Sequence, residues 1–246
     1  MSESQQTMLY EGKAKKVYQT SDEHLLLVTY KDDATAFNGE KRGTINGKGR
    51  VNCEISAILF EKLETAGIPT HFVKMTAPGE MLVKAVSILP VEVIVRNIAS
   101  HTLQKRLGTE EGTVLNNPIL EFSYKNDALG DPMVNDDHII VLGWATRQQL
   151  DRIREMALTI NRHLQRLLLK AGLTLVDFKL EFGIYGGRVI LADEISPDTC
   201  RLWDTKTGKK MDKDRFRLDL GEIEETYQEV LSRITRALAQ HEKHAD

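Results

Sequence analysis

A buried strand is predicted by the stretch Leu175-Val176-Asp177-Phe178-Lys179-Leu180-Glu181-Phe182-Gly183. Successive side chains of a strand point to opposite faces, so Val176, Phe178, Leu180 and Phe182 are expected to fill the core. The other face then carries Asp177, Lys179 and Glu181 as a row of acid, base and acid. Two interpretations fit this row: a solvated outer face of an antiparallel sheet, or a functional surface.

The next apolar run ends in two more carboxylates and reads Val189-Ile190-Leu191-Ala192-Asp193-Glu194. It predicts a hairpin over residues 174–195, with two open registers. A two-residue turn at Gly186-Gly187 places Asp193 opposite Leu180, whereas a three-residue loop over 186–188 places it opposite Glu181. We favour the three-residue loop because facing carboxylates repel unless a cation lies between them, and oxygen ligands suit Mg²⁺. This register makes Glu181 and Asp193 candidate metal ligands.

Local patterns predict the other elements. Turn-rich residues between two β-like runs indicate a hairpin over 16–30, and helical spacing of apolar residues predicts helices over 47–66, 146–172 and 222–240. Strands are expected at 81–84 and 91–96, joined by a rigid connector at Ile88-Leu89-Pro90. Because hairpins and helices segregate along the chain, the predicted class is α+β, with antiparallel sheets and packed helices. We expect two lobes, 1–87 and 88–246.

A lysine-rich turn precedes the first strand. Gly12 is followed by Lys13, Ala14, Lys15 and Lys16. Glycine lets backbone N–H groups approach a phosphate and lysines add positive charge, although a solvated turn has the same composition. The chain has neither a Walker A loop nor a G-x-G-x-x-G motif.

Two further segments have polar groups in positions suited to binding. On the predicted strand 91–96, Glu92, Ile94 and Arg96 share one face, which fits either a cleft wall or simple ion pairing. Residues 193–204 are predicted to form a loop after the hairpin, where binding residues concentrate.

Composition excludes several classes of protein. The 246 residues include 33 basic and 36 acidic ones, a formal charge of −3, which gives no bulk attraction to nucleic acid or an anionic membrane. Cys53 and Cys200 fit no disulfide framework or metal motif and are expected to be reduced thiols. The polar N-terminus Met1–Gln6 differs from a signal peptide, and no apolar run approaches the ~20 residues that span a bilayer. A cytoplasmic protein is expected.

The following runs occur in a fixed order from residue 8 to about 235: Tyr10-Glu11-Gly12-Lys13-Ala14-Lys15-Lys16-Val17-Tyr18, Thr35-Ala36-Phe37-Asn38-Gly39, Leu89-Pro90-Val91-Glu92-Val93-Ile94-Val95-Arg96-Asn97, Val176-Asp177-Phe178-Lys179-Leu180-Glu181-Phe182-Gly183, Asp193-Glu194-Ile195-Ser196-Pro197-Asp198, Trp203-Asp204 and Met211-Asp212-Lys213-Asp214-Arg215-Phe216-Arg217. In this order and spacing the chain resembles the SAICAR synthetase family (phosphoribosylaminoimidazole-succinocarboxamide synthases) in its short bacterial form. The D-x-K-x-E-F-G and D-E-x-S-P-D elements are specific to that family.

The resemblance implies an ATP-dependent ligase of de novo purine synthesis that joins L-aspartate to the carboxylate of the imidazole ribonucleotide CAIR, releasing SAICAR, ADP and phosphate. It also implies Mg²⁺, an ATP cleft between the lobes, a distant likeness to kinases and ATP-grasp enzymes, and a homo-oligomer, either dimer or trimer. The implied roles are ATP binding by Gly12, Lys13, Ala14, Lys15, Lys84 and Ile88; metal binding by Glu181 and Asp193; catalysis by Asp177 and Lys179; and ribonucleotide binding by Arg96, Thr102, Asp198 and Arg201.

One departure from the family concerns the residues after Arg96. The family usually has a run of small residues ending A-G-S, whereas this chain has Ser100-His101-Thr102. Thr102 keeps the hydroxyl, but His101 is bulky where glycine would let a phosphate approach the backbone.

Two other classes of protein share part of this pattern. A kinase would share the two lobes, the glycine-containing loop and the metal-binding acids, but the chain has neither an H-R-D catalytic loop nor a D-F-G motif. A nucleotide-binding regulatory module would not need the D-x-K-x-E row.

Overall fold

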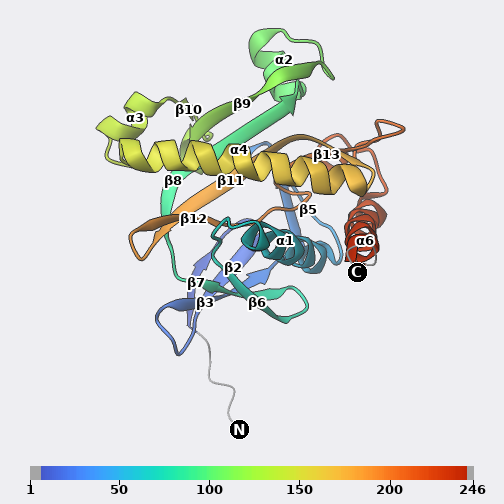
Figure 1. The fold of residues 1–246 in the computed structure, drawn as a ribbon. Helices are drawn as coiled ribbons and strands as arrows, with labels where there is room; N and C mark the ends of the chain where they lie inside the picture. Colours follow the sequence, from blue (N-terminus) through green and yellow to red (C-terminus); the bar gives the residue numbers. More distant parts are fainter. Residues whose placement is uncertain (1–6, 243–246) are drawn as a thin grey trace.

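The computed structural model describes residues 7–242 and builds its first sheet from the N-terminal third of the chain (Figure 1). The polar N-terminal residues 1–6, which differ from a signal peptide, lie outside the described part. This sheet has the strand order β1-β2-β3-β7-β6. Its strands are β1 (Met8–Glu11), β2 (Lys15–Gln19), β3 (Leu25–Tyr30), β6 (Phe72–Ala77) and β7 (Glu80–Lys84). The predicted hairpin over 16–30 is confirmed as β2 and β3, whereas β1 was not predicted.

The second sheet contains the charged row. Its order is β10-β9-β8-β11-β12, and β13 also pairs with β11. The strands are β8 (Ser87–Ile98), β9 (Val114–Tyr124), β10 (Met133–Val134), β11 (Leu173–Tyr185), β12 (Arg188–Ala192) and β13 (Cys200–Asp204). All of the pairings in both sheets are antiparallel. A separate two-stranded ribbon pairs β4 (Asp33–Ala36) with β5 (Lys41–Thr44).

Three long helices confirm the three that were predicted. They are α1 (Lys48–Thr65), α4 (Arg147–Lys170) and α6 (Ile223–Glu242). Thr146 caps α4 in a reciprocal capping box with Gln149, as its sequence indicates. The shorter helices are α2 (His101–Leu107), α3 (Asp136–Val141) and α5 (Asp214–Arg217), with 3-10 turns η1 (Phe37–Gly39) and η2 (Asp127–Leu129).

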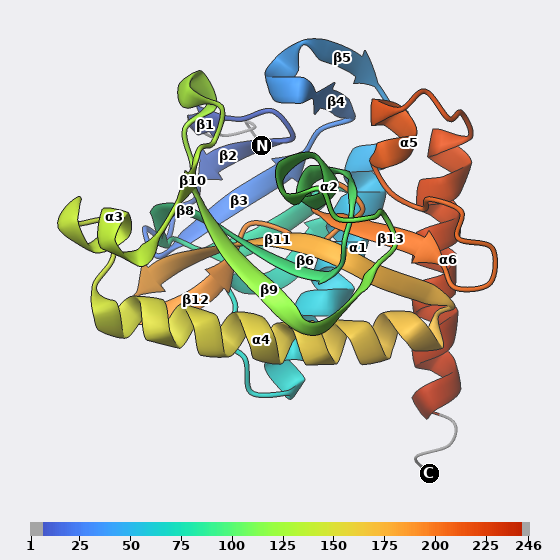
Figure 2. The same cartoon turned by 90° about the horizontal axis from the view of Figure 1, so that it is seen from above.

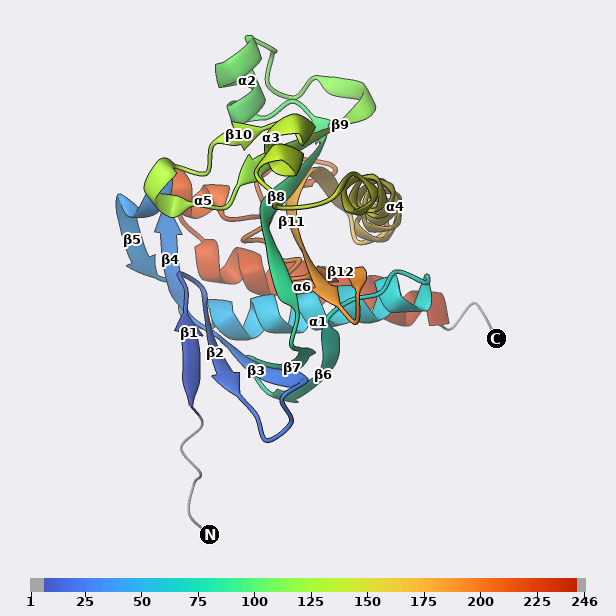
Figure 3. The ribbon, with the colours of Figure 1, turned by 90° about the vertical axis from the view of Figure 1, so that its left-hand side faces the viewer.

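The long helices cover the apolar faces of the sheets. Helix α4 runs along the face of the second sheet formed by β8 and β11 (Figure 2). Helix α1 packs on β3, β6 and β7 of the first sheet, and α6 runs alongside α1 (Figure 3). One continuous cluster of buried residues includes Phe60 of α1, Val83 of β7, Leu164 of α4 and Leu180 of β11. These features confirm the α+β class.

The predicted connector at residues 88–90 is wrong, because these residues belong to β8. Ile88 pairs with Gly183 and Glu92 pairs with Glu181, so three residues of β8 bulge opposite one residue of β11. Pro90 lies in this bulge, where its missing N–H group interrupts no regular ladder hydrogen bond. Its carbonyl accepts a hydrogen bond from Lys125 of the neighbouring chain segment, at 3.0 Å.

The predicted hairpin register is also wrong. Tyr185 pairs with Arg188, so the turn has two residues, Gly186-Gly187, both at positive φ. This register would place Asp193 opposite Leu180, on the apolar face. However, β12 ends at Ala192, and Asp193 has a φ of 62°. The left-handed conformation turns the chain out of the ladder, and asparagine and aspartate tolerate it better than most residues do.

The division into lobes at residues 87 and 88 stays a prediction: the two sheets do divide near this point, but they share the buried cluster described above. Cys53 and Cys200 are both free and buried. Within residues 7–242, no helix is long and apolar enough to cross a bilayer.

Candidate active site

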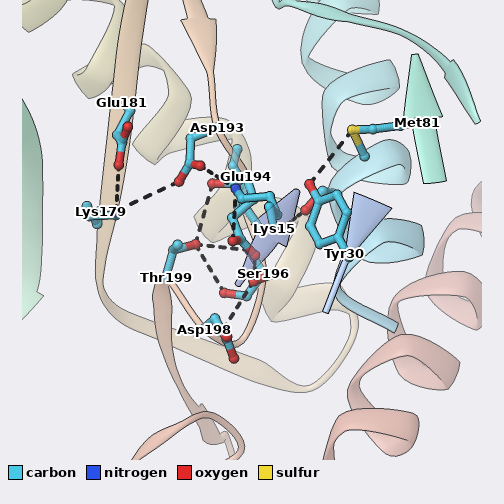
Figure 4. A network of polar contacts seen from close by, with 12 residues as sticks. Lys15, Tyr30, Met81, Lys179, Glu181, Asp193, Glu194, Ser196, Asp198 and Thr199 are labelled. Atoms are coloured by element: carbon cyan, nitrogen blue, oxygen red, sulfur yellow. Dashed lines mark hydrogen bonds and ion pairs between the residues drawn. The ribbon is translucent and has the colours of Figure 1, made fainter. Parts of the chain in front are cut away.

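The charged row on β11 is buried and paired, not solvated. Asp177 and Glu181 are 3% and 2% exposed. Lys179 lies between carboxylates: its Nζ is 2.9 Å from Oε1 of Glu92 on the neighbouring β8 and 2.7 Å from Oε1 of Glu181. Asp193 lies on the other side of the same ammonium group, at 3.7 Å (Figure 4). The interpretation as a solvated outer face is therefore wrong.

The lysine-rich turn reaches the same cluster. Residues 12–14 connect β1 to β2, and Lys15 at the start of β2 contacts Asp193 directly and Glu194 at 3.1 Å (Figure 4). Burial opposes the charge of Lys15, but the two carboxylates outweigh it and hold the pKa of Lys15 well above its ordinary value. Lys13 pairs with Asp127 at 2.6 Å near the surface. A lysine of the first sheet thus meets the end of the hairpin in the second.

A first hollow of about 240 Å³, which we call the lysine hollow, lies between the β1–β2 turn and the second sheet. Among the predicted residues its wall contains Gly12, Lys13, Ala14, Lys15, Lys179, Glu181, Asp193 and Asp198. The structure therefore brings together the predicted phosphate-binding turn, the two candidate metal ligands and one candidate catalytic residue.

A second hollow, of about 410 Å³, contains the predicted ribonucleotide-binding residues and is called here the arginine hollow. Its wall includes Arg96, Thr102, Asp177, Asp198 and Arg201. The two hollows share Glu92, Asp131, Lys179, Asp198 and Thr199, so they adjoin along one wall.

In the arginine hollow, one carboxylate holds two arginines. An Oδ atom of Asp177 is 2.9 Å from Arg96 and 3.0 Å from Arg201, and it accepts a hydrogen bond from Ser100 at 2.7 Å. Burial opposes the charge of Arg201, but its acidic neighbours prevail and raise its pKa. Arg96 also pairs with Glu121 at 2.7 Å. The guanidinium groups are thereby fixed in place to receive an anion.

Asp198 lies on the shared wall, and side chains of two helices donate hydrogen bonds to its carboxylate. Its Oδ2 accepts from Lys48 at 2.8 Å and its Oδ1 accepts from Tyr227 at 2.7 Å. Burial opposes ionisation of Asp198, but Lys213 and Lys48 outweigh it and keep its pKa below the ordinary value. Helices α1 and α6 thus both fix a carboxylate of the site.

Two predicted ATP-binding residues lie apart from the others. Lys84 donates to the carbonyl of Thr70 at 2.8 Å, and Ile88 is 43% exposed. Neither belongs to the wall of the lysine hollow or the arginine hollow. His101, at the position where the resemblance predicts glycine, is exposed at the start of α2.

Several residues of the site were not predicted. Lys125 pairs with Glu181, Lys48 and Tyr227 hold Asp198, and Lys213 and Arg217 line the hollows. The last two belong to a run that contributed to the resemblance, which was the available signal. Lys48, Tyr227 and Lys125 lie in ordinary helical or loop sequence that gives no such signal.

The residues present fit a hard divalent cation. Glu181 and Asp193 offer oxygen ligands. The described residues contain no group of three or more histidine, cysteine or acidic side chains arranged for a metal, so the protein itself would supply only these two carboxylates. Mg²⁺ typically takes one or two carboxylates and completes its shell with water and substrate phosphates. Around Lys179, the carboxylates of Glu92, Glu181, Asp193 and Glu194 outnumber the ammonium groups of Lys15, Lys125 and Lys179. A cation brought with a phosphate would offset that excess.

Lysines next to a glycine-containing turn, carboxylates and paired arginines are the kinds of groups that enzymes acting on phosphate-bearing substrates use. The comparisons with known proteins give the particular class. Residues 8–234 match the SAICAR synthetase family model, and the chain belongs to that family.

Named relatives and solved structures agree with this assignment. A phosphoribosylaminoimidazole-succinocarboxamide synthase of Desulfitobacterium hafniense (strain Y51) is 58% identical over 231 residues, covering 94% of this chain and 97% of the relative. The crystal structure of the Ehrlichia chaffeensis synthase superimposes with a TM-score of 0.91 at 46% identity, covering 93% of this chain and 98% of the other. A SAICAR synthetase in complex with ADP has a TM-score of 0.89 at 48% identity, covering 92% and 97%. The predicted family and the predicted ATP-dependent ligase class are confirmed.

Proposed function

We propose that this chain joins L-aspartate to the carboxylate of CAIR with consumption of ATP, and gives SAICAR, ADP and phosphate in de novo purine synthesis. The observation that supports this most directly is the wall shared by the two hollows. Lys179, which lies between carboxylates, lines both hollows, and the arginine hollow is suited to an anionic ribonucleotide. A phosphate donor in one hollow and an acceptor carboxylate in the other would meet there.

ATP phosphates lie in the lysine hollow. The turn Gly12-Lys13-Ala14 brings backbone N–H groups close to them, and Lys15 adds a fixed positive charge. Glu181 and Asp193 would hold Mg²⁺, which when bound neutralises charge on the phosphates. The adenine is expected between the sheets near Lys84 and Ile88, outside the lysine hollow itself.

CAIR lies in the arginine hollow. Arg96 and Arg201 bind its phosphate together with the hydroxyl of Thr102, and Asp198 lies beside the ribonucleotide. Asp177 holds both guanidinium groups in place, while Lys179 faces the reacting carboxylate and neutralises charge that develops during phosphoryl transfer. The activated carboxylate is an acyl phosphate, and the amine of aspartate displaces its phosphate.

Two further properties belong to the same proposal. The protein works in the cytoplasm, and it forms a homo-oligomer, either a dimer or a trimer. Light scattering coupled to size exclusion gives its mass directly, and a mass of one chain at assay concentration contradicts the oligomer.

The experiment that tests the function is a coupled assay of ADP release. Full release is expected with ATP, Mg²⁺, CAIR and L-aspartate together, and loss of turnover when any one is omitted. Omission of aspartate also separates the ligase from the kinase alternative. Full turnover with a sugar or a peptide hydroxyl in place of CAIR would assign the chain to the kinases instead.

A further inference from the structure

Helices α1, α4 and α6 meet around a third hollow, of about 240 Å³, which we call the three-helix hollow. Figure 2 shows α6 beside the C-terminal end of α4. The deepest part of the wall is apolar and consists of Leu59, Leu63 and Leu164, all of which are buried. No residue of this wall lines the lysine hollow or the arginine hollow, so the three-helix hollow is distinct from the proposed active site.

The charged side chains at the rim of this hollow are all basic. They are Lys62 of α1 and His163, Arg166 and Lys170 of α4, and the described part of the wall contains no acidic residue. The chain as a whole has the opposite balance, with 36 acidic and 33 basic residues. The rim therefore concentrates positive charge next to an apolar surface.

The cations of α4 differ in their pairing along the helix. In its N-terminal half, Arg147, Arg152 and Arg154 each contact a carboxylate. In its C-terminal half, Arg166 and Lys170 are exposed, and neither contacts a carboxylate of the described residues. Two like charges four residues apart on a helix repel each other. An anion bound at the rim would relieve this repulsion.

Stabilisation of the helix ends explains only part of this charge. Lys62 and Lys170 lie in the last turns of α1 and α4, where a cation interacts favourably with the helix dipole. Arg166 lies one turn before the end of α4 and still lines the hollow. A role at the helix end does not require a cation beside the buried leucines, whereas binding of a ligand with an apolar and an anionic part does.

We propose that the three-helix hollow binds an amphipathic carboxylate, which is a single alkyl chain that ends in a carboxylate group. The chain packs on the three leucines, and the carboxylate contacts Arg166 and Lys170. The size of the hollow favours a single chain over a partner helix, because a helix in a groove needs apolar contacts over about two turns. Helix α1 offers only the single turn from Leu59 to Leu63. The site is independent of the proposed ligase function.

Isothermal titration calorimetry with sodium decanoate, below its micelle concentration, tests the site on the full-length protein. One decanoate per chain is expected to bind, with a Kd on the order of 10–100 µM for a ligand of this size. Decyltrimethylammonium has the same alkyl chain but a positive head group, and it should bind at least about 10-fold more weakly. Saturating ATP and Mg²⁺ should leave the Kd for decanoate unchanged, because the active site lies elsewhere.

Two variants locate the bound ligand. The double variant of Arg166→Met and Lys170→Met removes both charges, keeps long apolar side chains, and should raise the Kd by on the order of 10-fold. Ala237→Phe places a ring in the hollow from α6 and should abolish binding without a change of charge. Arg152→Met is the matched control and should keep the wild-type Kd, since Arg152 lies on the same helix but does not line the hollow.

Several outcomes would overturn the inference. They include no saturable binding of decanoate by wild type, equal binding of decyltrimethylammonium, and an unchanged Kd in either folded variant, with folding checked by circular dichroism. Displacement of decanoate by ATP would place it in the lysine hollow instead. Binding that splits an oligomer into single chains, measured by light scattering, would show that a second copy covers the hollow. Binding to phosphatidylglycerol vesicles but not to monomeric decanoate would indicate a membrane surface as the partner.

Discussion

The ammonium nitrogen of Lys179 lies 3.7 Å from a carboxylate oxygen of Asp193, although the ladder of β11 and β12 would direct the two side chains to opposite faces. The left-handed backbone of Asp193, with φ at 62°, removes that residue from the ladder and returns its side chain to the polar face. The result is a carboxylate pair, Glu181 and Asp193, with one ammonium group between them. The proposed metal site depends on this local conformation rather than on strand register.

We therefore expect Glu181→Gln and Asp193→Asn each to reduce turnover steeply while the protein stays folded. Asparagine tolerates a positive φ, so Asp193→Asn removes charge without straining the backbone. The loss corresponds to several kcal/mol, roughly 3, of transition-state stabilisation. Turnover should be measured across a Mg²⁺ titration, in which both variants are expected to require more Mg²⁺ than wild type. Wild-type rates at limiting Mg²⁺ in either variant would eliminate the proposed role.

The buried pair of Lys48 and Asp198 provides a test of stability. Lys48→Met leaves the buried Asp198 carboxylate with the more distant ammonium group of Lys213, at 3.5 Å instead of 2.8 Å. Removal of one partner from a buried ion pair typically costs about 3 kcal/mol. We expect the free energy of unfolding to fall by about that amount in urea titrations. Asp198→Asn in the same chain removes the uncompensated charge, so the double variant should be more stable than Lys48→Met alone. Strict additivity of the two single changes would contradict the coupling.

A close backbone contact at the start of α1 gives a prediction about packing. A Cβ atom on Gly49 would lie 2.6 Å from the carbonyl oxygen of Tyr30, and no side chain is there to move aside. Gly49→Ala should therefore destabilise the protein by about 3 kcal/mol despite the better helix propensity of alanine. The neighbouring Arg50→Ala is the control, because the Arg50 side chain is half-exposed and its replacement is expected to change stability little. Thermal unfolding of both variants tests this prediction, since only Gly49→Ala is expected to lower the Tm markedly.

The alternation of residues 175–183 was enough to predict which side chains face the core and which face the site, because strand geometry alone determines it. The three long helices followed from apolar spacing and caps for the same reason. The path of the chain at Asp193 was not predictable from register, since it depends on a single φ angle. The bulge at Pro90 likewise depends on the neighbouring strand, which local sequence does not describe.

The contacts of the site that were not predicted join residues far apart in the sequence. Lys15 meets Asp193 across 178 residues, and Lys48 meets Asp198 across 150. No periodicity relates such positions. The composition of the lysine-rich turn made Lys15 a candidate for phosphate binding, but its contact with Asp193 was not predicted. Lys48 belongs to no quoted motif, and its role became visible only when α1 was placed against the loop after β12.

A buried imidazole gives the last prediction. His71 is 6% exposed, its ring meets Phe60 edge-on at 5.3 Å, and its Nε2 has no hydrogen-bond partner among the described residues. Burial, together with the charge of Lys15, lowers the pKa of His71 from 6.5 to about 3. Between these values the unfolded chain binds a proton that the folded chain does not. The contribution of His71 to stability is therefore complete above pH 6.5 and is lost progressively as the pH falls towards 3.

His71→Leu should flatten this dependence, because leucine fills a similar volume and binds no proton, while the main-chain bond from residue 71 to Leu191 is kept. Urea unfolding at pH 7.0 and pH 5.0, without nucleotide or Mg²⁺, measures the difference. Wild type is expected to lose up to about 2 kcal/mol more than the variant over this interval, at 1.36 kcal/mol per pH unit below pH 6.5. His24→Leu is the control, since His24 is 71% exposed and its loss should keep the wild-type slope. Equal slopes for wild type and His71→Leu would show that the buried imidazole accepts its proton without opening the fold.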